Sequence, residues 1–136
     1  MSRVARTQHP PRASACLLLL TLMSLALRML GLRRTIALAY RLGGRIGEQR
    51  RDDPLARESA LSVVRAAAFF PARAECLEQS LVLLIVLRRR GMAAELRVGM
   101  QPMPFTAHAW VELHDWPINE QPDFVARLAP FPSIGG

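Results

Sequence analysis

Two residues have the types and settings needed for covalent catalysis, Cys76 and His108. Cys76 lies at the predicted start of an apolar helix, where the unpaired backbone N–H groups and the helix dipole stabilise a thiolate. The same N–H groups could hold the oxyanion of a tetrahedral intermediate. A small apolar residue that only happens to begin a helix is the ordinary alternative for Cys76, so its position alone assigns no role.

His108 supplies the second group, on the segment AHAWVEL, whose pattern alternates as a strand does. Alternation places His108, Trp110 and Glu112 on one face of that strand and the alanines on the other. A helix packed over the face of His108 would bring Cys76 within reach, and the imidazole would then be the general base. The alternative is a core histidine whose ring only satisfies local hydrogen bonds.

A third group on the neighbouring strand is expected to orient the imidazole. Glu120, at the end of the segment WPINE, is the best candidate. Asn119 is adjacent and could do the same by hydrogen bonding, but alternation lets only one of the two face the site. Asp115 lies in the predicted turn, where its side chain would be held less firmly.

The elements that must position these residues are helices first and strands afterwards. Asp53 and Pro54 mark a helix start, and Gly91 is the expected C-terminal cap of the helix that Cys76 begins. We predict helices over residues 15–32, 33–48, 53–70 and 75–90. We predict strands over 96–100, 107–113 and 116–120, followed by a short helix over 124–128. This order indicates an α+β fold in a single domain.

The charge of the chain is +7, and all 18 cationic residues are arginine. A surface this basic attracts an anionic partner, such as an acidic peptide or a lipid headgroup. Nucleic acid is not expected, because only 6% of the residues are aromatic and no recognition motif is present. No Cys/His cluster has zinc spacing, so we predict no metal and no cofactor, and we expect Cys16 to be a reduced, buried thiol.

The apolar run over 15–32 has three interpretations: a membrane span, a cleaved signal, or a helix that is buried or docks in a groove. Its polar residues Thr21, Ser24 and Arg28 fall on one stripe of a helix. No small-x-small cleavage site follows at the right distance. The third interpretation is favoured, with membrane association as the next alternative.

The motifs RAECLEQSLVLLIVLRRRGMAAELRVGM at 73–100 and FTAHAWVELHDWPINEQPD at 105–123 resemble those of transglutaminase-like cysteine enzymes. They are most similar to those of the leader peptidases of lasso-peptide biosynthesis, the small B proteins. The resemblance implies that Cys76 is the nucleophile, that His108 is the base, and that Glu120 stands where the family commonly places Asp.

The resemblance also implies a fold and partners. Residues 51–136 would form a transglutaminase-like or papain-like cysteine protease core, preceded by a helical segment at 15–50 and a disordered basic stretch at 1–14. The substrate would be a lasso-peptide precursor. Because the residues before the catalytic helix are predicted to be helical, the leader-recognition domain is expected as a separate protein, alongside a cyclase. The apolar helix at 15–32 is a candidate docking surface for such a partner or for the membrane.

Three functions follow from these patterns. The leading one is a cytoplasmic cysteine peptidase, peripheral at the inner membrane face if the apolar helix binds lipid, that removes the leader from the precursor. An acyl transferase would use the same thioester, with an amine in place of water. A non-catalytic, membrane-associated interaction protein is the alternative from a different class, in which the order of Cys, His and Glu is accidental.

Overall fold

The order of elements in the structure, a computed structural model, confirms the α+β prediction. It describes residues 11–44, 53–68, 76–102, 105–114, 116–120, 122–126 and 128–130. The helices of the first part are α2 (Ala13–Leu30), α3 (Leu32–Gly43), α4 (Asp53–Ala68) and α5 (Cys76–Arg89). The second part holds β1 (Ala94–Pro102), β2 (Phe105–Leu113), β3 (Trp116–Pro117), α6 (Pro122–Ala126) and β4 (Ala129–Pro130).

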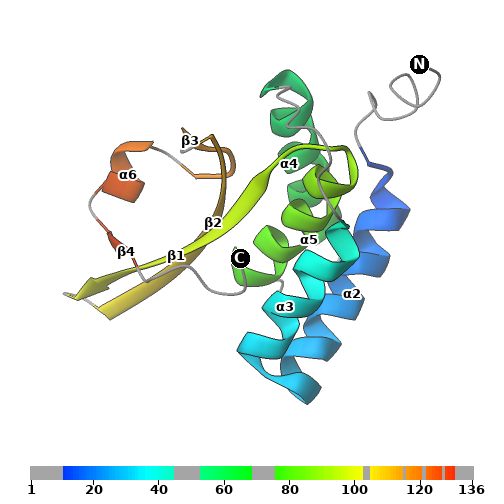
Figure 1. The fold of residues 1–136 in the computed structure, drawn as a ribbon, viewed down its shortest axis with the longest axis horizontal. Coiled ribbons are helices and arrows are strands. Elements are labelled where there is room, and N and C mark those ends of the chain that lie inside the picture. The colour runs from blue at the N-terminus through cyan, green and yellow to red at the C-terminus, as the bar shows by residue number, and fades with distance from the viewer. Residues whose placement is uncertain are drawn as a thin grey trace.

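Helix α5 is the centre of the molecule, packed against α2, α3 and α4 and against strands β1 and β2 (Figure 1). Every residue from Ser80 to Leu87 is buried, which follows from a helix that is apolar on all sides. The predicted cap is confirmed: Gly91 has φ 84°, and Met92 N–H donates to the Leu87 carbonyl at 3.0 Å. β1 therefore turns back along α5.

Helices α2 and α3 form a pair that breaks at Gly31, whose φ of 85° favours glycine. α2 turns one face into the core through Cys16, Leu20, Met23 and Ala26. This burial supports the interpretation of residues 15–32 as a core helix, although α2 is also long and apolar enough to cross a membrane. The helix begins at Ala13, inside the stretch predicted as disordered, because alanine favours helix.

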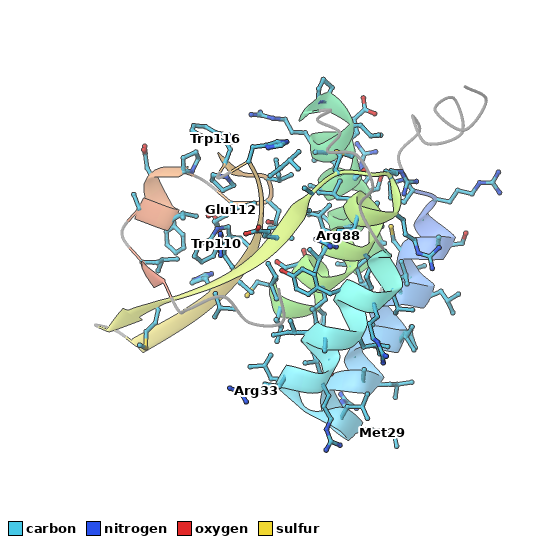
Figure 2. All side chains as sticks on the ribbon, viewed as in Figure 1. Met29, Arg33, Arg88, Trp110, Glu112 and Trp116 are labelled. Atoms are coloured by element: carbon cyan, nitrogen blue, oxygen red, sulfur yellow. The ribbon has the colours of Figure 1, made fainter. Side chains whose placement is uncertain are left out.

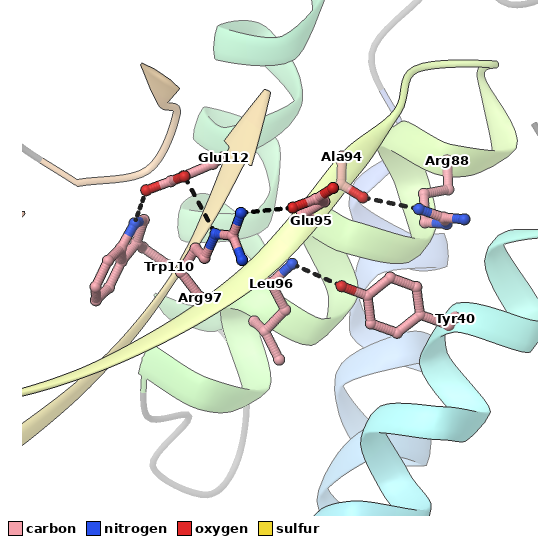
Figure 3. Close-up of polar contacts among 8 residues, drawn as sticks. All are labelled: Tyr40, Arg88, Ala94, Glu95, Leu96, Arg97, Trp110 and Glu112. Atoms are coloured by element: carbon pink, nitrogen blue, oxygen red, sulfur yellow. Dashed lines mark hydrogen bonds and ion pairs between the residues drawn. The ribbon is translucent and has the colours of Figure 1, made fainter. Parts of the chain in front are cut away.

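Tyr40 and Arg88 connect this helix pair to the sheet (Figure 3). Tyr40 Oη accepts a hydrogen bond of 3.0 Å from the Leu96 N–H of β1. The Arg88 guanidinium lies 4.8 Å from the centre of the Tyr40 ring and donates to the Ala94 carbonyl at 2.9 Å. α3, the end of α5 and the start of β1 thus share one part-buried polar junction.

The sheet is antiparallel, in the order β3-β2-β1-β4, and lies between α5 and α6 (Figure 1). One face packs into the helical core through Leu96, Ala109, Val111 and Leu113. Trp110 lies on the opposite face, on the side of α6 (Figure 2). The predicted alternation of strand 107–113 is therefore confirmed, and β2 starts two residues earlier than predicted.

The third strand is shorter than the predicted range 116–120, because β3 ends at Pro117 and residues 118–120 form a bend. The bend keeps one ladder bond, from Ile118 N–H to the Val111 carbonyl at 2.9 Å. The next partner of β2 is a side chain: Asn119 Oδ1 accepts from Val111 N–H at 2.8 Å. Because a side-chain oxygen takes the place of a backbone carbonyl here, the ladder of backbone hydrogen bonds between β2 and β3 ends.

Other predicted boundaries also shift. The second helix ends at Gly43 because Gly44, with φ 79°, terminates it, and α6 begins and ends earlier than the predicted 124–128. β4, which pairs with β1 at Gly99 and Met100, was not predicted. The predictions for Asp115 and for residues 1–10, 45–52 and 69–75 lie outside the described residues.

Candidate active site

Cys76 is the first residue of α5, and its thiol is free and exposed. Cys16 is also free but buried, so the predicted burial of Cys16 is confirmed. Burial raises the pKa of the Cys16 thiol above its ordinary value, and the nearby charge of Arg90 offsets part of that rise. The thiolate is the nucleophilic form, so Cys76 is the cysteine whose surroundings suit chemistry.

His108 is half-buried on β2, opposite Gly99 of β1. Its ring meets the ring of Phe124 edge to face, with centroids 4.8 Å apart. Nδ1 of the imidazole is buried and has no hydrogen-bond partner among the described residues. A buried nitrogen without a hydrogen-bond partner lowers the stability of the folded protein, unless substrate binding supplies a partner.

The helix over the face of His108 is α6, which corrects the expectation that the Cys76 helix would cover it. Alternation is the reason: Ala109 and Val111 point into the core beside α5, so the ring of His108 must point to the other side. Cys76 and His108 therefore approach from the two sides of the sheet.

A serine connects the start of α5 to β2 at this point. Ser80 is four residues after Cys76 on the same helix face, and its Oγ donates to the Ala109 carbonyl at 3.0 Å. The peptide groups of Val111 point away from β1, toward Ile118 and Asn119. Since peptide directions alternate along a strand, the Ala109 carbonyl points to that same edge.

The first turn of α5 thus lies beside the β3-side edge of β2. α5 and β2 run in the same direction, because β1 is antiparallel to both (Figure 1). One helical turn of about 5.4 Å before Ser80 corresponds to roughly two strand residues before Ala109. Cys76 is consequently about level with Ala107, the residue before His108 on the strand.

Asn119 completes a polar junction at this edge. Its Oδ1 accepts from Val111 N–H, and its Nδ2 donates to Ser80 Oγ at 3.0 Å. Both ends of the amide are engaged in holding the bend against β2 and α5. Glu120, the next residue, is half-buried in the same bend. Because these two residues are not in a strand, the alternation argument that set one against the other does not apply.

A second polar network lies on the His108 face of the sheet (Figure 3). Trp110 Nε1 donates to Glu112 Oε2 at 2.9 Å, and Arg97 bonds both Glu112 at 3.3 Å and Glu95 at 2.7 Å. The indole lies over Gly99, where an added Cβ would be 2.8 Å from Trp110 Cη2. This network fixes the indole beside the strand pair that carries His108.

Sequence analysis missed Ser80 and Phe124. Ser80 had a signal, since it is a polar residue at the head of an apolar helical run, one turn after Cys76. Phe124 had none, because nothing local predicts which face of the sheet α6 covers. Among the described residues, no group of three or more His, Cys, Asp or Glu could hold a metal. The catalytic roles of Cys76, His108 and Glu120 stay predictions.

Comparison with known proteins gives two matches. A model of the transglutaminase-like superfamily matches residues 17–133. The microcin J25-processing protein McjB of Escherichia coli is 32% identical over 76 residues, which are 56% of this chain and 36% of that protein. No solved structure matches. The resemblance predicted from the motifs around Cys76 and His108 is thereby confirmed.

Proposed function

Because the chain belongs to the transglutaminase-like superfamily, we propose that it is a cysteine peptidase that removes the leader peptide from a lasso-peptide precursor. The similarity to the microcin J25-processing protein of E. coli supports a role in peptide maturation. The observation that carries the proposal is the Ser80 bond to Ala109, because it ties the turn that begins at Cys76 to the residue beside His108.

In the proposed reaction the Cys76 thiolate attacks the carbonyl carbon of the amide between leader and core. Backbone N–H groups of the first turn of α5, at the positive end of the helix dipole, stabilise the oxyanion that forms. His108, protonated when Cys76 becomes a thiolate, donates its proton to the leaving amine as the C–N bond breaks. Water, deprotonated by His108, then hydrolyses the thioester, releases the leader acid and restores the thiol.

Glu120 is proposed as the group that orients the imidazole, and Asn119 as the residue that holds the bend in place. This division of roles rests on the two hydrogen bonds of Asn119, which commit its amide to Val111 and Ser80. The buried Nδ1 of His108 is the nitrogen that would receive an orienting partner. Precursor binding would draw Glu120 toward that nitrogen, since the bend that carries Glu120 runs back along β2 in the direction of His108.

Recognition of the leader is proposed to depend on a separate protein, with a cyclase acting on the released core. The support is the helical character of α2, α3 and α4, the elements that the structure describes ahead of α5. Strand addition to an open sheet edge is a common way to grip an extended peptide. None of these helices offers such an edge.

The direct test is cleavage of a lasso precursor in the presence of its recognition protein, followed by mass spectrometry. Wild type should release the leader, and Cys76→Ala should not. Cys16→Ala is the matched control, because it removes a thiol from the core and leaves the proposed nucleophile in place. Cleavage by the Cys76→Ala variant would show that the proposed mechanism is wrong.

The same assay separates hydrolysis from acyl transfer. In water enriched with ¹⁸O, a peptidase places one heavy oxygen in the new leader carboxylate. With an added primary amine, an acyl transferase would instead give a leader amide. A leader amide as the main product would replace the peptidase proposal with acyl transfer on the same thioester.

A further inference from the structure

The outward face of α2 is apolar and is not covered by any of the residues that the structure describes. Leu18 is 72% exposed and Met29 is 81% exposed, the highest values among the large hydrophobic residues described as exposed. The residues spaced three and four apart along this face continue across the turn into α3. We define the α2 surface by Leu18, Leu22, Leu25, Met29, Leu30 and Leu32, each at least 42% exposed.

This arrangement differs from the stripe that the sequence predicted. Thr21 and Arg28 are exposed as expected, but leucines stand on both sides of them along the same face. The opposite face of α2 is used by the core, through Cys16, Leu20 and Met23. An apolar surface of this extent on a soluble fold marks a contact with something apolar.

The charged residues of α2 and α3 are all of one sign. Every charged residue of α2 and α3 is an arginine, and each of them is exposed: Arg28, Arg33, Arg34 and Arg41. Arg12, at the opposite end of α2, is exposed as well. Figure 2 shows Met29 and Arg33 at the same end of the helix pair. No carboxylate occurs between residues 11 and 44.

We propose that the α2 surface binds a membrane of anionic lipids, with α2 lying in the plane of the interface. The leucines and Met29 would enter the acyl region, while the arginines at both ends reach the headgroup phosphates. The complementarity of charge identifies the occupant. A second copy of this chain would bring arginines against arginines with no carboxylate on the surface to pair them.

The orientation leaves the candidate active site free. The α2 surface belongs to the helical side of the molecule, whereas α6 and the face of His108 lie beyond the sheet (Figure 1). A protein bound to lipid in this way would still present Cys76 and the edge of β2 to a peptide. The proposal concerns attachment and does not depend on the reaction.

The test is flotation of the purified full chain with vesicles. Binding is expected to vesicles of equal phosphatidylcholine and phosphatidylglycerol and not to phosphatidylcholine alone, and it should weaken as salt is added. Leu22→Gln/Leu25→Gln/Met29→Gln should abolish it. Arg33→Gln/Arg34→Gln should weaken it by at least about tenfold.

Matched controls separate this surface from general stickiness or charge. Trp116→Gln removes an exposed aromatic residue on the far side of the sheet, and Arg57→Gln/Arg65→Gln removes two exposed charges from α4. Both should bind as wild type does, and so should Cys76→Ala. All variants change exposed positions, and circular dichroism in urea checks that each folds.

Three outcomes would overturn the proposal. The first is equal binding to neutral and anionic vesicles, which would remove the role of the arginines. The second is unchanged binding by the triple glutamine variant. The third is a dimer in sedimentation without lipid that the triple variant converts to a monomer, which would assign the surface to a second copy.

Discussion

The two cysteines show how the same side chain acquires opposite properties from its surroundings. Cys16 lies at 0% exposure among core residues of α2, where desolvation raises its pKa. Cys76 is exposed at the first residue of α5, the positive end of the helix dipole. Reactivity toward electrophiles follows the thiolate, so the two residues should differ in rate by a wide margin.

Alkylation by iodoacetamide at neutral pH should therefore modify Cys76 and leave Cys16 unmodified while the protein is folded. Peptide mass spectrometry measures both sites in one sample. In urea above the unfolding transition, Cys16 should become reactive because its desolvation is lost. Modification of Cys16 in the folded protein at the rate of Cys76 would contradict the difference in burial.

Asn119 and Glu120, neighbours in the bend after β3, should have different roles. Asn119 should support the stability of the fold, and Glu120 should support the rate of cleavage. Asn119→Ala leaves the Val111 N–H and one bond of Ser80 unmet, so the free energy of unfolding should fall by about 1–3 kcal/mol. Urea denaturation measures this loss. Glu120→Gln should change stability little and slow cleavage.

Rescue distinguishes the two roles further. Glu120→Asp keeps the carboxylate that the family commonly carries at this position, so it should retain more cleavage than Glu120→Gln. If Glu120→Gln cleaves at the wild-type rate while Asn119→Ala folds normally and does not cleave, the third member of the proposed triad is Asn119.

At the scale of elements, predictability depended on whether the signal was local. The limits of α5 could be predicted because its apolar run, its arginine-rich end and Gly91 all lie within the helix and its cap. The faces of β2 followed from alternation. The end of β3 could not, because it depends on the Asn119 side chain bonding Val111 on another strand. The position of α6 over His108 depends likewise on a contact distant in sequence, with Phe124.

The strand position of Gly99 has no room for a side chain. The sequence pattern did not predict this, because Gly99 fits the alternation like any other strand residue. An alanine Cβ there would lie 2.8 Å from Trp110 Cη2 and 2.9 Å from Leu128 Cβ. Gly99→Ala should lower the free energy of unfolding by about 1–3 kcal/mol through overpacking, as measured in urea. Combining it with Trp110→Phe should cost less than the sum of the two changes. An additive result would show that the indole is not the obstacle.

At the scale of the whole molecule, the α2–α3 pair and the sheet both pack against one helix, α5. α5 contacts α2, α3 and α4 on one side and β1 and β2 on the other. Tyr40 of α3 reaches the backbone of β1, and Gly43 approaches Arg88 so closely that a Cβ would be 2.8 Å from Arg88 Cβ. The elements on the two sides of the predicted boundary near residue 50 therefore pack together as one unit.

A chain that begins at residue 51 should accordingly fail to fold cooperatively, although it contains Cys76, His108 and Glu120. Without α2 and α3, the all-apolar surface of α5 would face water, and Leu96 N–H would lose the Tyr40 hydroxyl. The loss of one such buried hydrogen bond costs about 1–3 kcal/mol, and the lost apolar burial costs more. Urea denaturation followed by circular dichroism should show a broad transition for the fragment and a single sharp one for the full chain. Tyr40→Phe in the full chain is the graded control, since it removes the bond alone and should shift the midpoint without broadening the transition. A fragment that unfolds sharply at the midpoint of the full chain would show that the sheet and α5 form an independent core.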